Sequence, residues 1–169
     1  MAIIPIRTVP DPVLRQKARR IKTVDRTISR LIEDMWETLR TVNGIGLAAP
    51  QVGVPIRLIV ISIPRKEQNN EEYAIINPEV LRRKGERIVK EGCLSIPGYI
   101  GEIKRSESVR VKGLDPAGKE IKLRAEELLA QALEHEIDHL NGVLYVDRLE
   151  SQDKLHKAEP EIEPKPEMG

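Results

Sequence analysis

The chain has 169 residues and a mass of 19.1 kDa, which fits roughly one domain of ~150 residues. Hydrophobic residues make up 40% of the chain and Phe is absent, so we expect a single core built from Ile, Leu, Val and Ala. A formal net charge of +1 gives no electrostatic case for binding a polyanion through the whole surface, and scarce aromatic residues disfavour nucleic-acid readout. The single cysteine excludes the disulfide scaffold of small secreted proteins.

Membrane anchors and export signals have no counterpart in the sequence. The longest near-apolar run, residues 58–63, is far shorter than the roughly 18 residues that a spanning helix needs. The N-terminal residues lack the basic region of a signal peptide. We therefore expect a cytoplasmic protein that does not contact a membrane.

Predicted elements in the first two thirds of the chain are one long helix followed by strands. Apolar residues recur at helical spacing over residues 25–43, after a shorter helical stretch at residues 13–18. Asp25 stands near the start of the long helix, and Gly44 follows its end, where a left-handed residue is easiest. Short β-branched runs then predict strands at residues 56–63, 73–76 and 109–112, and a turn joins the last of these to a strand at residues 120–123.

A second helix is predicted over residues 125–141, with Gly142 as its C-terminal stop. Glu136 is unusual because it places a carboxylate among the apolar positions of this helix. After a short run at residues 143–146, the chain becomes rich in Pro and Glu. We expect one catalytic domain over residues 1–150 and a polar tail over residues 151–169 that does not pack.

The segment His135-Glu136-Ile137-Asp138-His139 carries the strongest chemical signal. Two histidines four residues apart lie one turn along the same helical face, so both imidazoles can reach one metal ion. Glu136 stands beside them. Asp138 faces elsewhere on the helix, and we expect it to accept a hydrogen bond rather than to bind metal.

Two histidines leave a tetrahedral ion in need of a third protein ligand and an open position for water. An astacin-like or matrixin-like protease would need a histidine where this chain has Tyr145. A thermolysin-like protease would need a Glu on a following helix, and Glu150 is a weak candidate for it because it is close in sequence. The acidic residues after Glu150 lie in a Pro-rich segment that disfavours a helix. The third candidate is Cys93, whose thiolate would bind a divalent ion strongly and whose neighbour Gly92 lets the backbone approach closely.

A third segment, Gly44-Ile45-Gly46-Leu47-Ala48-Ala49-Pro50-Gln51, follows the first long helix. Its glycines and small residues expose main-chain N–H and C=O groups, and Gln51 adds a side-chain amide donor. Taken alone, this segment fits a loop that packs under a helix equally well.

The three segments together resemble peptide deformylase, the family that removes the N-formyl group from nascent chains. The family motifs Gly-φ-Gly-φ-Ala-Ala-x-Gln, Glu-Gly-Cys-φ-Ser and the His-Glu…Asp-His type stand in the family's order, here at residues 44–51, 91–95 and 135–139. The resemblance runs from Pro10 to about Leu149. It implies an α+β fold with antiparallel and mixed β-sheets around a central metal-binding helix.

The resemblance implies metal-dependent hydrolysis of N-formylmethionyl nascent peptides, which releases formate and a free amine. Its site residues carry over as Cys93, His135 and His139 for the metal, Glu136 for proton transfer, and Gln51 and Leu94 as donors to the developing oxyanion. Ala132 lies three residues before His135 on the same helical face, so we expect an apolar wall for the methionine side chain there. The residues expected to bind substrate are Ile45, Gly46, Gly92, Leu128 and Ala132.

A thiolate with two imidazoles suits both Zn²⁺ and Fe²⁺, so ligand identity does not choose between them. The resemblance implies one Fe²⁺ ion, for which Zn²⁺ substitutes. It also implies transient association with the ribosome, where nascent chains are made.

Two positions depart from the family pattern. Glu134 stands where the family often has Gln, which we expect to alter only local polarity. The stretch Gly98-Tyr99-Ile100-Gly101 lacks the Arg with which many members contact the substrate backbone, so that contact is in doubt. A later family Arg is retained as Arg105, and the resemblance implies that it forms an ion pair with Glu91 and so holds the loop of Cys93.

Two other functions use part of the same pattern. A zinc endopeptidase would explain the histidine pair but would give Cys93 and Gln51 no role. A metal-stabilised binding module or metal sensor would normally hold its ion with four protein ligands, and Glu136 would be superfluous. The number of ligands therefore separates the sensor from the enzyme.

Overall fold

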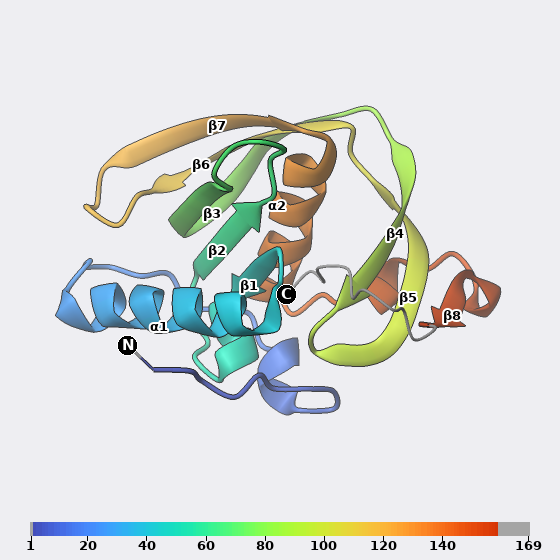
Figure 1. Cartoon of the computed structure of the whole chain (residues 1–169), viewed down its shortest axis with the longest axis horizontal. Helices are drawn as coiled ribbons and strands as arrows, with labels where there is room; N and C mark the ends of the chain where they lie inside the picture. The colour runs from blue at the N-terminus through green and yellow to red at the C-terminus, as the bar shows by residue number, and fades with distance from the viewer. Residues whose placement is uncertain (1, 159–169) are drawn as a thin grey trace.

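The computed structural model describes residues 2–158, which form two β-sheets around one buried helix (Figure 1). The five-stranded sheet has the order β1-β2-β3-β6-β7, with strands Gly46–Ala48, Leu58–Ile63, Glu71–Lys84, Ser108–Leu114 and Glu120–Glu126. The three-stranded sheet has the order β4-β5-β8, with strands Arg87–Cys93, Ile96–Arg105 and Leu155–Lys157. The helices are α1, Arg26–Val42, and α2, Glu127–Leu140. The predicted α+β class with a central helix is confirmed, although both sheets are antiparallel rather than mixed.

The helix α1 begins where its sequence predicts. The Asp25 carboxylate accepts a hydrogen bond from the Ile28 N–H at 3.1 Å, which satisfies a donor that the first turn leaves free. The helix ends at Asn43, which has φ 51°, so Asn43 rather than Gly44 is the left-handed residue. Asn tolerates this conformation better than most side chains, and the Asn43 N–H bonds back to the carbonyls of Leu39 and Arg40.

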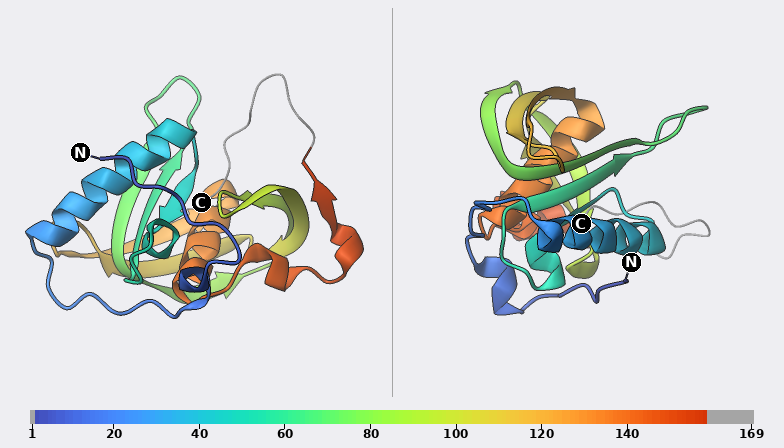
Figure 2. Two further views of the ribbon diagram at one scale, coloured as in Figure 1. Left: turned by 90° about the horizontal axis from the view of Figure 1, so that it is seen from below. Right: turned by 90° about the vertical axis from the view of Figure 1, so that its left-hand side faces the viewer.

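Strand β2 is buried on both faces, because helices cover the sheet on each side at this point (Figure 2). Ile59, Ile61 and Ile63 pack in the same cluster as the buried residues of α2. Leu58 and Val60 point the other way and pack with α1. This two-sided burial explains why the strand is a continuous apolar run instead of an alternating one.

The helix α2 is the centre of the molecule, and every residue from Leu129 to Leu140 is buried. Its end is fixed by Gly142, which has φ +72° and approaches Arg15 so closely that an added Cβ would lie 2.6 Å from the Arg15 carbonyl oxygen. The predicted stop is confirmed. Residues 125 and 126, predicted as helix, instead belong to the end of β7.

Four strands, β1, β4, β5 and β8, were not expected from the sequence. Strands β4 and β5 mix glycine with charged residues and expose one face, so they lack a clear apolar run. The tail was expected to stay unpacked from residue 151, but Lys157 pairs with Tyr99 and His156 pairs with Ile100. That expectation is wrong for residues 155–157, and residues 159–169 lie outside the described residues.

Two short stretches form 3₁₀ turns, and the first of them was predicted as a helical stretch at residues 13–18. The stretch predicted as helix near residue 13 is Pro12–Arg15, and the run expected near residue 143 gives Tyr145–Arg148. Within residues 2–158, no helix combines the length and apolar character needed to cross a bilayer.

Candidate active site

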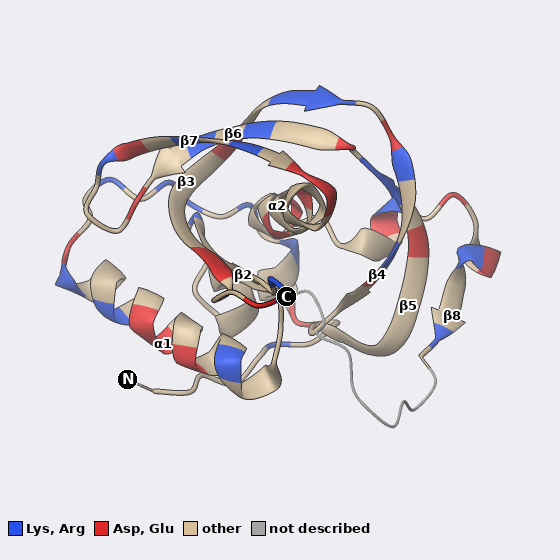
Figure 3. Ribbon diagram, turned by 45° about the horizontal axis from the view of Figure 1, so that its top comes forward, with Lys and Arg blue, Asp and Glu red and all other residues tan. Residues whose placement is uncertain are grey.

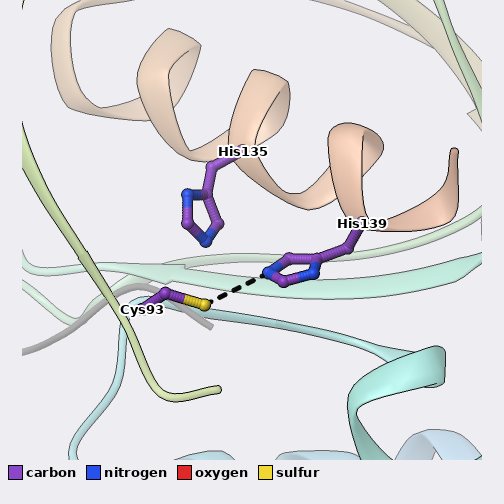
Figure 4. A group of neighbouring side chains, drawn as sticks. All are labelled: Cys93, His135 and His139. Carbon is purple, nitrogen blue, oxygen red and sulfur yellow. Dashed lines mark hydrogen bonds between the residues drawn. The ribbon is translucent and has the colours of Figure 1, made fainter. Parts of the chain in front are cut away.

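Three metal-ligating side chains meet beside α2 (Figure 4). His135 and His139 project from successive turns of the helix, and Cys93 comes from the end of β4. The ligand atoms of the three residues all lie within 4.8 Å of one another, and Cys93 Sγ is 3.4 Å from His139 Nε2. The imidazole rings stand nearly edge to face, with centroids 5.0 Å apart.

This donor set fits one divalent metal ion. Metal–sulfur bonds of about 2.3 Å and metal–nitrogen bonds of about 2.0 Å in a tetrahedron place sulfur and nitrogen roughly 3.5 Å apart, close to the separation of Cys93 and His139. Among the residues that the structure describes, the cluster holds three protein donors rather than four. A three-donor set leaves a position for water, which is the arrangement of catalytic sites rather than of closed structural ones.

Glu136 supplies a carboxylate that is fully buried at this site. Neither of its oxygens has a hydrogen-bond partner within the described part of the chain. Burial raises the pKa of Glu136 to about 8, while the neighbouring His135 and His139 act in the opposite direction. Burying a carboxylate without a hydrogen-bond partner costs free energy of folding. Its presence here therefore points to a water molecule or ligand that binds to the Glu136 carboxylate.

Gly46 makes room for this carboxylate. A Cβ added at Gly46 would lie 2.6 Å from Glu136 Oε2, which real contacts do not tolerate. The loop that begins at Gly44 therefore passes directly over the acid of α2. The glycine is required by the close approach of β1 to the site rather than by an unusual φ angle.

Gln51 reaches the site from the same loop, and its amide is held in one orientation. The Ala48 N–H donates to Gln51 Oε1 at 2.9 Å, so the amide nitrogen must point the other way. That nitrogen lies 3.1 Å from Ser95 Oγ and 3.9 Å from Cys93 Sγ. Gln51 is fully buried, and its NH₂ group is directed at the cysteine loop.

A chain of buried charges supports His135 from behind. The His135 Nδ1–H donates to Glu91 Oε2 at 2.6 Å, so Nε2 is the ring nitrogen that could hold a metal ion. Arg105 donates to both oxygens of Glu91, at 3.0 and 2.6 Å, so the expected ion pair is confirmed. Burial opposes ionisation of Glu91, but His135 and Arg105 hold its pKa at about 2.

The same chain continues to Asp138, which accepts hydrogen bonds as expected. Arg105 Nη1 donates to Asp138 Oδ2 at 2.8 Å, and Arg148 donates to both Asp138 oxygens, at 2.6 and 2.7 Å. Burial favours the neutral acid, yet the two guanidinium groups lower the pKa of Asp138. The network thus ties α2, β4 and β5 to the 3₁₀ turn at Arg148.

Two members of this network were missed in the sequence. Gln131 Nε2 donates to Glu91 Oε1 at 3.2 Å and to the Lys90 carbonyl at 3.4 Å. Its spacing of four residues before His135 was the available signal. No sequence pattern indicated Arg148, because only the tertiary fold brings this residue to α2.

The residues expected to bind substrate fall in different environments. Ile45 and Ala132 are buried in the core cluster around α2, and the half-buried Leu128 packs at its edge. Leu94 lies in the turn between β4 and β5, directly after the cysteine. An added Cβ at Gly92 would lie 3.5 Å from the Tyr99 carbonyl oxygen, an ordinary contact, so close backbone approach does not explain that glycine.

The first departure from the family pattern, Glu134, has a structural consequence. Glu134 is buried and accepts hydrogen bonds from the Ser106 N–H at 2.7 Å and the Ser106 hydroxyl at 3.0 Å. It also pairs with Arg83 at 3.0 Å. The expectation that Glu134 alters only local polarity is therefore wrong, because its carboxylate joins α2 to two other segments.

A central helix that carries two histidines and a buried glutamate, opposite a cysteine on a neighbouring strand, is typical of a metal-dependent hydrolase. Residues 3–155 match the family model described as polypeptide deformylase. The chain belongs to the peptide deformylase family.

Individual relatives are similar over nearly the whole chain. A peptide deformylase of Dehalococcoides mccartyi is 50% identical over 163 residues, which cover 96% of each chain. The crystal structure of a peptide deformylase from Legionella pneumophila has a TM-score of 0.85 at 46% identity, covering 90% of this chain and 89% of that one. The Ehrlichia chaffeensis enzyme in complex with actinonin has a TM-score of 0.86 at 40% identity, with 91% and 92% covered.

Proposed function

We propose that this chain hydrolyses the N-terminal formyl group of formyl-methionyl peptides and releases formate, using the site around α2. The observation that carries this proposal is the meeting of Cys93, His135 and His139 beside the buried, unpartnered carboxylate of Glu136. An endopeptidase would use the histidines and the glutamate alone. Here the cysteine and Gln51 are packed into the same site, which a deformylase explains and an endopeptidase does not.

Cys93, His135 and His139 would hold the metal, and Glu91 would fix the orientation of His135. A divalent ion bound there supplies Lewis acidity, which polarises the formyl carbonyl and makes a water molecule more acidic. We propose Fe²⁺ as the native ion, with Zn²⁺ able to substitute. A thiolate and two imidazoles bind both ions, and the family resemblance favours iron.

Glu136 is placed to move protons during the reaction. Its carboxylate is the one buried acid at the site whose oxygens are not used by a hydrogen bond within residues 2–158. We assign it the proton of the attacking water, which it passes to the departing amine. The low-polarity surroundings that raise its pKa to about 8 make the carboxylate a stronger base than one in water.

Gln51 and the Leu94 N–H are assigned to the oxygen of the formyl group, which gains negative charge as the carbon becomes tetrahedral. The bond from Ala48 pre-orients the Gln51 amide, so no reorganisation is needed when charge develops.

Gln51→Ala should lower kcat about 100-fold, because losing one oxyanion donor typically costs about 3 kcal/mol of transition-state stabilisation. Metal content should stay unchanged, since Gln51 is not a ligand. Steady-state formate release and metal analysis on the same preparation measure both quantities. Turnover near that of the unmodified protein would exclude this role.

Strand β1 is the edge of its sheet and is placed to bind the peptide backbone. The Ile45 carbonyl already accepts from the Ser62 N–H at 2.7 Å, so Ile45 faces β2. Alternation then directs the main-chain groups of Gly46 to the open edge, where an extended peptide can add as a strand. We assign the methionine side chain to an apolar wall of Ile45, Leu128 and Ala132, which belong to one cluster. We assign Gly92, the residue before Cys93, to contact with the substrate backbone.

The cellular setting is also part of the proposal. Residues 1–150 would form one catalytic domain, followed by a tail of residues 151–169. Strand β8 of this tail pairs with β5. Formylated nascent chains are made by cytoplasmic ribosomes, so we place the protein in the cytoplasm, in transient contact with the ribosome.

Formate release from a formyl-Met tripeptide tests the function directly. Anaerobically prepared, iron-loaded protein should release formate from this peptide, should release none from the unformylated peptide, and should act poorly on a formyl-Asp peptide. Absence of formate with metal bound would refute deformylation. Equal rates with formyl-Met and formyl-Asp would refute the apolar wall.

Iron-loaded protein should lose activity in air, because both a ferrous ion and the Cys93 thiolate can be oxidised. The zinc-loaded protein should be slower but stable under the same exposure, since zinc has no redox chemistry. Activity followed over time, with intact-mass analysis of Cys93, distinguishes loss of iron from oxidation of the thiolate. A zinc form as active as the anaerobic iron form would contradict the assignment of iron.

A further inference from the structure

A basic surface on the five-stranded sheet lies outside the catalytic site. Arg82 of β3 pairs in register with Arg110 of β6, and Arg110 pairs with Arg124 of β7. The three residues form one row across three neighbouring strands, which we call the arginine row. Figure 3 shows blue segments of these strands side by side.

The arginine row faces away from α2. Arg110 is exposed, whereas its neighbours Val109 and Val111 are buried in the core against α2. Because side chains alternate between the faces of a sheet, Arg110 and its register partners point to the opposite face. On that face α1 packs over β1 and β2, and the half of the sheet with the arginine row stays open to solvent.

The arginines of the row are free of salt bridges within the described residues. The adjacent Arg83 pairs with Glu134 of α2, but none of the three arginines of the row makes an ion pair in residues 2–158. Glu126, two residues after Arg124 on β7, is an exposed acid on the same face, and Glu79 is paired with Lys112 at 3.9 Å. Like charges directly opposite one another on neighbouring strands repel, so the arginine row lowers the stability of the folded protein.

The row also shapes the surface. A pocket of about 90 Å³ is lined by Arg82, Lys84, Ser108, Val109, Arg110 and Arg124. A larger cleft of about 760 Å³ shares Lys84 and Arg124 with this pocket and extends to Leu128 and Gln131 of α2. Its charged lining is mixed, because it also holds Arg87, Glu107, Glu126 and Glu127. The arginine row therefore borders a cleft of mixed charge that reaches the proposed methionine wall at Leu128.

We propose that the arginine row is a docking surface for the phosphate backbone of RNA. Guanidinium groups on strands about 4.8 Å apart offer several forked donors to phosphate oxygens along a nucleic-acid chain. The surrounding residues supply no aromatic ring for stacking on bases, so binding is expected to be independent of base sequence. The whole-chain charge of +1 hides this local excess of positive charge.

RNA is the occupant that the proposed function favours, and the inference rests on that function. The substrate is a nascent peptide, which emerges from a particle whose surface is rich in RNA. Docking through the arginine row would hold the enzyme near its substrate without occupying the metal site. The row would thus provide the ribosome contact that the sequence did not assign to any residues.

The test uses full-length, metal-loaded protein and a fluorescently labelled RNA hairpin of mixed sequence, followed by anisotropy. Reversing the row in an R82E/R110E/R124E variant should weaken RNA binding at least tenfold at about 0.1 M salt. It should also reduce the salt slope by about 2 to 3, since each lost phosphate contact removes about one unit or slightly less. The R82Q/R110Q/R124Q variant removes the three positive charges without adding negative ones. It should also weaken RNA binding, but by less than the glutamate variant.

The matched control is K22E/R26E/R30E, which makes the same change in net charge at exposed positions before and on α1. It should bind RNA nearly as well as the unmodified protein. Deformylation of a free formyl-Met tripeptide should be unchanged in every variant, which shows that each is folded and tests the proposed function separately from RNA binding.

Two results would overturn the inference. Equal loss of RNA binding in the control would assign the effect to net charge and not to the arginine row. Binding of the unmodified protein to vesicles that contain anionic phospholipid, with none to the hairpin, would assign the surface to a membrane.

Discussion

Glu136→Ala is expected to reduce kcat for formate release by roughly 10²- to 10⁴-fold, the usual contribution of a positioned general acid or base. The expectation follows from a fully buried carboxylate that no hydrogen bond within residues 2–158 occupies. The metal should be retained at full occupancy, because the three ligands are on other residues. Single-turnover formate release with parallel metal analysis measures both effects.

Glu136→Gln provides the conservative control. Glutamine has nearly the same size but cannot take up a proton, so it should lose as much activity as alanine while it leaves no cavity. Glu134→Gln is the matched substitution of a neighbouring buried glutamate, and it should keep most of the activity. A Glu136→Gln variant with more than a tenth of the original kcat would contradict the proton-transfer role.

Arg105→Ala should have the largest effect on stability and should also weaken metal binding. Its removal leaves Glu91 without its forked partner and takes one of the two arginines from Asp138, in a site where all these side chains are buried. Breaking a buried ion pair from one side typically costs about 3–5 kcal/mol. Because Glu91 orients His135, metal affinity should fall about 10- to 100-fold.

Urea denaturation of the metal-free protein and a metal titration of the folded protein separate the two effects. Arg105→Lys keeps the charge but not the forked geometry, so it should fall between alanine and the original residue. Arg148→Ala removes a partly exposed arginine from the same Asp138 and should be milder in both measurements. Unchanged metal affinity in Arg105→Ala would refute the role of the network in holding the site.

Several features that depend on residues close in the chain were predicted correctly from the sequence. The spacing of His135 and His139 predicts one metal-facing side of a helix, because residues four apart on any helix share a face. The start of α1 at Asp25 and the stop of α2 at Gly142 are equally local, and the structure agrees with both. Strands β4 and β5 were missed, since a half-exposed strand with glycines gives no clear pattern.

The sequence alone determined the local features of this protein: the histidine pair with its glutamate, the aliphatic core and most helix boundaries. Through resemblance to a family, it also indicated that Cys93 and Gln51 act with that pair. Only the tertiary structure showed Gln51 oriented by Ala48, Arg148 added to the buried charge network and three arginines aligned across separate strands. The physical reason is that these contacts join residues far apart in the chain, and strand register and helix packing set them rather than local spacing.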